Sequence, residues 1–266
     1  MVSQQETAAG SALPVTRRSV IRRKLADLGV VRTQDLVDEL GVSVETVRRD
    51  MAALERDGAL ERVHGGAVAA GQRLSVEPSF HDRTSAQGTG KARIGQAAAR
   101  LVSDESTLFL DVGTTALCVA AAIPASFRGL VATNSLPVAI ELARCPHATV
   151  LVAGGRLRSD DLATAGQYAI GLLEDLRVDL AFLGSGGVHP TSGLTDFHLD
   201  EIATRRAMMR NSARTFVLAD ATKFARIAPY HVAGWDSFTA LITDEEPPAV
   251  LRTAVQRGGA TVIVAQ

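Results

Sequence analysis

The sequence predicts a protein of α/β class, in which a small N-terminal helical domain precedes a larger domain built on a mostly parallel sheet. Two observations predict this division. Residues 17–66 carry three short amphipathic helical patterns, whereas the chain from Gly90 onward alternates apolar, β-rich runs with helical stretches. Apolar strands separated by helices are typical of a parallel sheet covered on both faces. We therefore expect domains over residues 17–70 and 90–266, joined by a linker over 71–89.

The N-terminal pattern is that of a helix-turn-helix followed by a wing. Each predicted helix begins after a capping residue and stops at a glycine, with caps at Ser19, Thr33 and Ser43 and stops at Gly29, Gly41 and Gly58. A short extended segment with a Gly65-Gly66 turn follows as the wing. Any small three-helix bundle would give a similar helical pattern.

Two charge patterns favour nucleic-acid binding over a plain bundle. On a helical wheel of about 100° per residue, the exposed face of the third helix centres near Arg49, and its N-terminal half presents Thr46, Arg48 and Arg49. Arginine can pair bidentately with guanine or clamp phosphates. Positive charge is also concentrated at the start of the domain, in Arg17, Arg18, Arg22, Arg23 and Lys24. An edge that contacts DNA phosphates and a solvated helix end would both show this pattern.

The larger domain is predicted to alternate strands with helices. We expect the strands at 107–112, 130–133, 149–153, 180–183, 215–219, 240–243 and 261–265. We expect the helices near 91–102, 114–123, 136–144, 163–176, 198–211 and 247–257.

Small and polar residues follow five of these strands, where ligands of open α/β sheets bind. Asp111 precedes Gly113-Thr114-Thr115 at a helix start, where free N–H groups and two hydroxyls suit an anion. The other strand ends carry Asn134-Ser135, Gly154-Gly155-Arg156, Gly184-Ser185-Gly186-Gly187 and Asp220-Ala221-Thr222-Lys223. Each group alone is as typical of a turn or a cap, but their convergence favours a pocket for a phosphorylated polyol. No dinucleotide or Walker motif occurs, so we expect no nucleotide cofactor.

Composition excludes several classes of protein. The 28 Lys and Arg residues balance 29 Asp and Glu residues among 266, so the chain is not a uniformly basic nucleic-acid binder, although a local basic patch is allowed. The chain has only three lysines, Lys24, Lys91 and Lys223. Because arginine is used almost everywhere else, a lysine is slightly more expected at a site that needs an ammonium group. Neither a signal-peptide core nor an apolar run of about 18 residues occurs, so we expect a cytoplasmic protein.

Residues 42–51, Val-Ser-Val-Glu-Thr-Val-Arg-Arg-Asp-Met, resemble the recognition-helix motif V-S-x-x-T-[IV]-R-R-D-L of the DeoR family of bacterial regulators. Residues 62–67, Arg-Val-His-Gly-Gly-Ala, resemble the wing of that family. The sensor-domain landmarks follow in order at Asp111 to Thr115, Thr133 to Ser135, Gly154-Gly155 and Ala219 to Phe224. The resemblance extends over residues 17–266.

The resemblance implies a DNA-binding transcriptional regulator, most often a repressor of sugar or carbohydrate metabolism genes. It also implies a sensor domain similar in fold to ribose-5-phosphate isomerase. The implied partners are double-stranded operator DNA, a phosphorylated sugar or sugar alcohol as effector, and further copies of the chain in a dimer or tetramer. In one departure, Arg205 stands where many relatives carry Lys, so the contacts there differ.

Specific residues carry these implied roles. The residues expected to contact DNA are Arg17, Arg18, Arg22, Ser43, Thr46, Arg48, Arg49, Arg62 and His64. The residues expected to contact the effector are Asp111, Gly113, Thr114, Thr115, Thr133, Asn134, Gly154, Gly155, Asp196, Glu201 and Lys223.

Two other functions compete with this one. An isomerase-like enzyme acting on sugar phosphates needs a general base, and several carboxylates are available, but the Asp-Gly-Ala-Asp-Glu run of the isomerase is absent. A redox or metal sensor would use Cys118 or Cys145, but both fall on apolar helix patterns, and the histidines show no ligand spacing. We therefore expect neither catalysis, nor a metal, nor a cofactor.

Overall fold

A computed structural model describes residues 13–28, 30–63, 66–69, 80–85 and 87–266. The chain divides into two compact units, residues 1–74 and 75–266. Within the described ranges, no helix has the length and apolar character that crossing a membrane requires.

The first unit is a three-helix fold with a small antiparallel sheet. Its described helices are α1 (Pro14–Leu28), α2 (Thr33–Leu40) and α3 (Val44–Arg56), and its strands are β1 (Val30–Arg32), β2 (Leu60–Val63) and β3 (Gly66–Ala69). The strand order is β1-β3-β2, so the predicted extended segment forms one hairpin of the sheet. The apolar faces of the helices meet in a core that includes Ile21, Leu36, Val47 and Leu54.

The first helix starts earlier than the capping pattern predicts. It begins at Pro14 and runs through Ser19, the expected cap. Proline suits the first turn of a helix because its missing N–H is not needed there. In addition, Arg17 pairs with Asp50 of α3 at 2.6 Å, which holds the early turns of α1 against α3.

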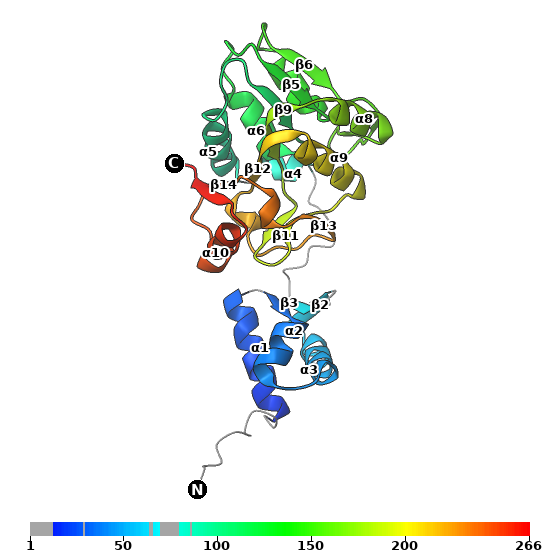
Figure 1. Ribbon diagram of the computed structural model, residues 1–266, viewed down its shortest axis with the longest axis vertical. Coiled ribbons are helices and arrows are strands. Elements are labelled where there is room, and N and C mark those ends of the chain that lie inside the picture. Colours follow the sequence, from blue (N-terminus) through cyan, green and yellow to red (C-terminus); the bar gives the residue numbers. More distant parts are fainter. Residues whose placement is uncertain (1–12, 29, 64–65, 70–79, 86) are drawn as a thin grey trace. The chain divides into compact units, whose positions relative to one another are not determined.

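The second unit contains, in its described part, a seven-stranded parallel sheet in the order β15-β14-β12-β9-β4-β5-β6 (Figure 1). The strands are β4 (Thr107–Leu110), β5 (Leu130–Thr133), β6 (Thr149–Val152), β9 (Val178–Leu183), β12 (Ser212–Leu218), β14 (Ala240–Thr243) and β15 (Thr261–Val264). All seven overlap the strands expected from the sequence, with ends that differ by a few residues.

Helices cover both faces of this sheet (Figure 1). One face carries α5 (Gly88–Ala99), α6 (Thr114–Ala122) and α7 (Leu136–Leu142), and the other carries α8 (Gln167–Asp175), α9 (Leu199–Arg210) and α10 (Ala249–Arg257). Along β4, Leu108 and Leu110 pack with the first group while Phe109 packs with the second. Burial on both faces explains why the strands are apolar throughout rather than alternating.

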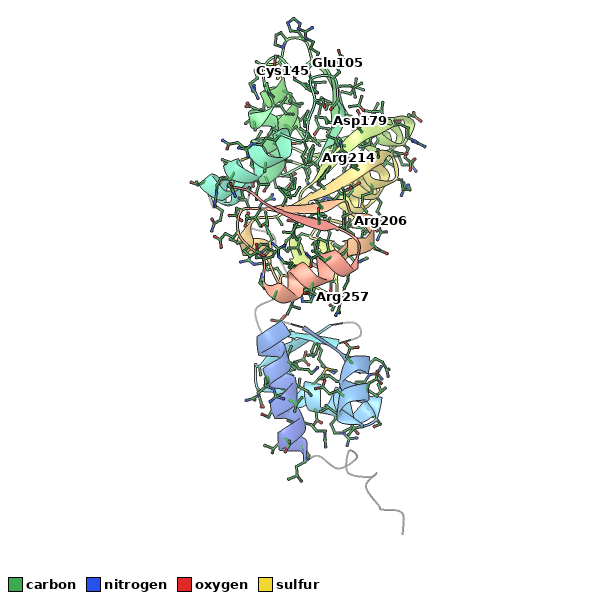
Figure 2. All side chains as sticks on the ribbon, turned by 60° about the vertical axis from the view of Figure 1, so that its left-hand side comes forward. Glu105, Cys145, Asp179, Arg206, Arg214 and Arg257 are labelled. Carbon is green, nitrogen blue, oxygen red and sulfur yellow. The ribbon has the colours of Figure 1, made fainter. Side chains whose placement is uncertain are left out.

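The strand order reverses between β4 and β9. From β4 the chain proceeds through β5 to β6 at one edge, and it then returns to β9 on the other side of β4. Ligands of open α/β sheets bind at such a switch point, beyond the carboxyl ends of the strands. At the opposite, amino-terminal ends, the Asp179 carboxylate accepts hydrogen bonds from the Thr107 backbone N–H and hydroxyl, both at 2.8 Å. Figure 2 shows Asp179 and Arg214 on the neighbouring strands β9 and β12 at that end.

The sequence did not predict several short elements. They are the hairpin of β7 (Arg156–Leu157) and β8 (Thr164–Ala165), the antiparallel sheet of β10 (Gly187–His189), β11 (Gly193–Asp196) and β13 (Tyr230–Ala233), and the 3-10 turns η1 (Ala221–Lys223) and η2 (Trp235–Ser237). Because residues 164–165 pair with β7, the helix expected from residue 163 begins at Gln167.

The expected linker also needs correction, because helix α4 (Phe80–Ser85) lies within it and α5 begins at Gly88. Helix α4 packs against α6, and the Lys91 ammonium donates a hydrogen bond to the Arg83 backbone carbonyl. These contacts with the larger unit give residues 80–85 a reason to be helical that local composition does not reveal.

Replacing Gly95 by Ala is expected to lower the free energy of unfolding by about 1–3 kcal/mol. Gly95 lies where α5 meets α6, and a Cβ there would sit 2.4 Å from the backbone oxygen of Cys118. The helices must move apart to accept it. Urea denaturation measures the effect, with Gly171→Ala in α8 as control, because a Cβ at Gly171 meets nothing within 4 Å. The control should gain about 0.5–1 kcal/mol from helix propensity; equal behaviour of both variants contradicts the close packing.

Candidate functional site

A pocket of about 410 Å³, including its open mouth, lies at the carboxyl ends of β4, β9 and β12, next to the switch point. Its described lining residues are Arg83, Lys91, Val112, Gly113, Thr114, Thr115, Gly184, Ser185, Asp196, Glu201, Arg205 and Lys223. Six of the residues expected to contact an effector are among them: Gly113, Thr114, Thr115, Asp196, Glu201 and Lys223.

The wall formed by α6 is suited to an anion. Gly113 has φ 108°, a conformation that L side chains rarely adopt, and it turns the chain from β4 into the first turn of α6. The first backbone N–H groups of a helix have no partner within that helix, and the helix dipole favours negative charge there. Thr114 and Thr115 add two hydroxyl groups at the same end of the helix. The local sequence therefore builds a cradle of donors.

Cationic side chains complete the pocket. Lys223 comes from η1 after β12, Lys91 from α5 and Arg83 from α4. Lys91 is buried, and burial lowers the pKa of its ammonium group; repulsion from Arg83 lowers it further, whereas Asp220 opposes the shift. Sequence reasoning missed Arg83 and Lys91 as site residues. The scarcity of lysine was the available signal, since two of the three lysines in the chain line this pocket.

Arg205 organises a buried acidic network beside the cations. Its Nε donates to Asp111 Oδ2 at 2.5 Å, its Nη2 lies 2.9 Å from Glu201 Oε2, and its Nη1 pairs with Asp196. Asp111 Oδ2 also accepts the Gly184 N–H at 2.9 Å, so this carboxylate is held outside the pocket lining. The planar guanidinium thus contacts three carboxylates, which a single lysine ammonium cannot match in geometry.

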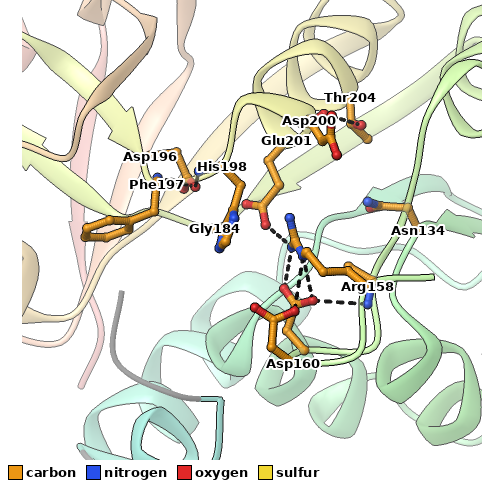
Figure 3. Close-up of polar contacts among 12 residues, drawn as sticks. Asn134, Arg158, Asp160, Gly184, Asp196, Phe197, His198, Asp200, Glu201 and Thr204 are labelled. Carbon is orange, nitrogen blue, oxygen red and sulfur yellow. Dashed lines mark hydrogen bonds and ion pairs between the residues drawn. The ribbon is translucent and has the colours of Figure 1, made fainter. Parts of the chain in front are cut away.

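A second arginine extends the network through Glu201. Arg158 pairs with both Glu201 and Asp161, and Figure 3 shows its side chain between Glu201 and Asp160. Burial raises the pKa of Glu201 well above its usual range, with Arg205 opposing and the Asp196 charge adding to the rise. For Asp196, burial alone would raise the pKa, but attraction to Arg205 outweighs it and the pKa is lowered. Asp196 therefore keeps its charge more readily than Glu201.

Besides Asp111, four residues expected to contact the effector lie outside the described pocket lining. Thr133 Oγ1 accepts the Ser135 N–H at 3.1 Å, and Asn134 Nδ2 donates to the Thr164 carbonyl at 3.1 Å, which fixes β8 against the end of β5. Gly154 and Gly155 are exposed after β6. A role in effector binding stays a prediction for these residues, as it does for those that line the pocket.

The exposed face of α3 carries the two expected base-reading arginines. Arg48 and Arg49 are exposed, and Arg48 lies 3.9 Å from the Glu45 carboxylate. Thr46 is half-buried, and its N–H donates to the Ser43 hydroxyl at 3.2 Å, so Ser43 caps α3 as predicted.

Acidic side chains elsewhere in the first unit pair with four of the five basic side chains from Arg17 to Lys24 in α1. Asp50 of α3 pairs with Arg17 at 2.6 Å and with Arg18 at 3.2 Å. Arg22 pairs with Asp57, and Lys24 pairs with Glu39.

The wing carries the remaining expected DNA contacts. Arg62 of β2 pairs with Glu55 at 2.6 Å. His64 lies outside the described residues. DNA contact by all of the expected residues, in α1, at α3 and in the wing, stays a prediction.

Two family models match the chain, and together they cover most of it. The DeoR-like helix-turn-helix domain matches residues 17–73, and the DeoR C terminal sensor domain matches residues 86–245. The glycerol-3-phosphate regulon repressor of Escherichia coli (strain K12) is 34% identical over 83% of this chain and 86% of its own length. The HTH-type transcriptional repressor CsqR of the same organism is 34% identical over 91% of this chain and 92% of its own length.

Solved structures give a more distant likeness. Ribose 5-phosphate isomerase A from Methanocaldococcus jannaschii is 17% identical, with a TM-score of 0.39 over 52% of this chain and 55% of that chain.

Proposed function

Because the chain belongs to the DeoR family of transcriptional regulators, we propose that it is a repressor controlled by a phosphorylated sugar or sugar alcohol. Family membership makes it a DNA-binding regulator and not an enzyme. The effector, its chemical class and the repressing action are the proposal. We propose further that its target genes serve sugar or carbohydrate metabolism and that it acts in the cytoplasm.

The observation that carries the effector class is the charge arrangement of the pocket. Backbone N–H groups and hydroxyls at the start of α6 face a space that Lys223 and Lys91 also line. These donors suit the phosphate of a small ester, because charge-assisted hydrogen bonds are about twice as strong as neutral ones. Asp196, Glu201 and Ser185 line the same space and can accept or donate hydrogen bonds to sugar hydroxyls.

The name of one relative supports the same class. The Escherichia coli repressor that is 34% identical to this chain is named for a glycerol-3-phosphate regulon, and glycerol 3-phosphate is a phosphorylated polyol.

A thermal-shift screen tests the effector class. Full-length protein is heated with phosphate esters of trioses, pentoses, hexoses and sugar alcohols, and with the same compounds lacking phosphate. A ligand that binds the folded state raises the melting temperature. We expect at least one ester to do so and its unphosphorylated partner to have little effect. A screen in which only unphosphorylated compounds raise the melting temperature contradicts the proposal.

The protein is also proposed to act as a dimer or tetramer. One recognition helix reads only a few base pairs, so a high-affinity operator needs two half-sites. Light scattering of the purified protein, with and without operator DNA, tests this; a monomer bound to a single half-site would contradict it.

Replacing Arg49 by Ala is expected to weaken specific operator binding by about 1–3 kcal/mol, because Arg49 is proposed to reach a base edge. The operator is first obtained by selecting the tightest duplex from a random library. Arg56→Ala is the matched control, since Arg56 lies on the C-terminal turn of α3 and should affect binding less. Unchanged affinity of the Arg49 variant for both operator and random DNA would exclude this role.

A further inference from the structure

The proposed function leaves one cation of the pocket, Arg83, without a role. Arg83 and Lys91 reach it from α4 and α5, at the start of the second unit, rather than from a strand end. Helix α4 is also the first helix or strand described after β3 of the DNA-binding unit. A residue that contacts a ligand from this helix connects the pocket to the chain that leads to the DNA-binding unit.

Contacts on both sides of Arg83 attach α4 to the pocket. Its side chain is half-buried and lines the pocket, and its Nη1 lies 4.0 Å from the place that a Cβ on Gly113 would take. Its backbone carbonyl accepts a hydrogen bond from the Lys91 ammonium. Because α4 packs against α6, the Arg83 guanidinium approaches the same helix start that offers backbone donors.

The charges make this attachment sensitive to an anion. Arg83 and Lys91 repel each other, and Lys91 is buried, so both costs fall when an anion lies between them. A guanidinium can bind a phosphate through two parallel N–H groups, which an ammonium cannot. An anion at the α6 cradle would therefore hold Arg83 more firmly than the empty pocket does.

We infer that Arg83 binds the phosphate of the effector and that this contact stabilises α4 against the second unit, so that α4 reports occupancy of the pocket to the DNA-binding unit. The inference rests on the proposed function. An effector acts on DNA binding only through interactions that differ between the two states of the protein. The Arg83 contact supplies that difference, whereas Lys223 and the α6 cradle supply affinity.

Hydrogen exchange of the full-length protein tests this with inorganic phosphate as the probe. Some amides exchange with solvent only after the ligand has dissociated. At a phosphate concentration of about ten times its Kd, exchange of these amides slows about tenfold. We expect this slowing both at residues 114–117 of α6 and at residues 80–85 of α4. In Arg83→Gln, at a concentration rescaled to its own Kd, the α6 amides should still slow and the α4 amides should not.

Two further variants sharpen the test. Arg83→Lys keeps the charge but loses the paired donors, so it should restore only part of the α4 response. Arg100→Gln removes an arginine at the end of α5 that is exposed and does not line the pocket, and it should behave as the unmodified protein.

The outcomes separate the two proposals. If phosphate slows the α6 amides but not the α4 amides of the unmodified protein, the inference is wrong and the proposed pocket stands. If Arg83→Gln keeps the full α4 response, the inference is also wrong. If phosphate slows neither segment, the anion pocket itself fails, and the inference fails with it.

Discussion

Arg205→Met is expected to lower the free energy of unfolding by about 3–5 kcal/mol, because it leaves a buried acidic network without its main cation. Arg205 is 2% exposed and contacts Asp111, Asp196 and Glu201, all of which are buried. Methionine fills a similar volume but offers no charge or donor. Urea denaturation at neutral pH measures the loss.

Arg210→Met on the same helix is the control. Arg210 pairs with Glu174 at 2.8 Å, but both side chains are largely exposed, at 58% and 49%. Exposed ion pairs contribute about 0–1 kcal/mol. If both variants lose the same small amount, the buried network does not depend on Arg205.

The pH dependence distinguishes loss of charge balance from loss of packing. Without Arg205, we expect Glu201 and Asp196 to have folded-state pKa values above those of the unfolded chain, because burial then lacks its main opposing charge, although Arg158 still opposes it at Glu201. A carboxylate of this kind binds more protons when folded, so the variant gains stability as the pH falls through the folded pKa. The deficit relative to the unmodified protein should therefore be smaller at about pH 5 than at about pH 8. An equal deficit at both values would indicate a packing defect alone.

The sheet was predictable because its residues are constrained locally. Leu108, Phe109 and Leu110 are all apolar, since β4 is buried on both faces, and the same holds for its neighbours. The short strands were not predictable in this way. The pairing of Leu194 with Ala233 joins residues far apart in the sequence, and neither segment carries a strong strand pattern by itself. Helix α4 was not predicted, because the contacts that stabilise it come from Lys91 and α6 rather than from its own residues.

The same distinction between local sequence and tertiary contacts applies to the site. Gly113, Thr114 and Thr115 form a local turn at a strand end, and the sequence alone predicted that they would line a pocket. Arg83 lines the same pocket only because the fold places α4 beside it. The pairing of Arg17 with Asp50 spans 33 residues, so the charge pattern of α1 alone could not show that the fold supplies this counter-charge. Sequence patterns identified donors at helix starts, and tertiary structure determined which charges are compensated.

The phosphate ester of the effector is expected to bind about 100-fold or more tightly than the free polyol. A phosphate in the pocket would accept backbone N–H bonds from α6, two hydroxyl bonds and one Lys223 contact. Each hydrogen bond to a charged group contributes about 1.5–3 kcal/mol, so two that survive desolvation account for the factor. Isothermal calorimetry with the ester and the polyol measures the ratio directly.

Lys223→Ala should weaken ester binding by roughly tenfold or more and leave polyol binding nearly unchanged. Lys24→Ala makes the same change of charge in the other unit, where Lys24 pairs with Glu39, and should leave both affinities unchanged. Equal affinities for ester and polyol, or equal affinities of the Lys223 and Lys24 variants for the ester, would show that the phosphate does not bind at this pocket.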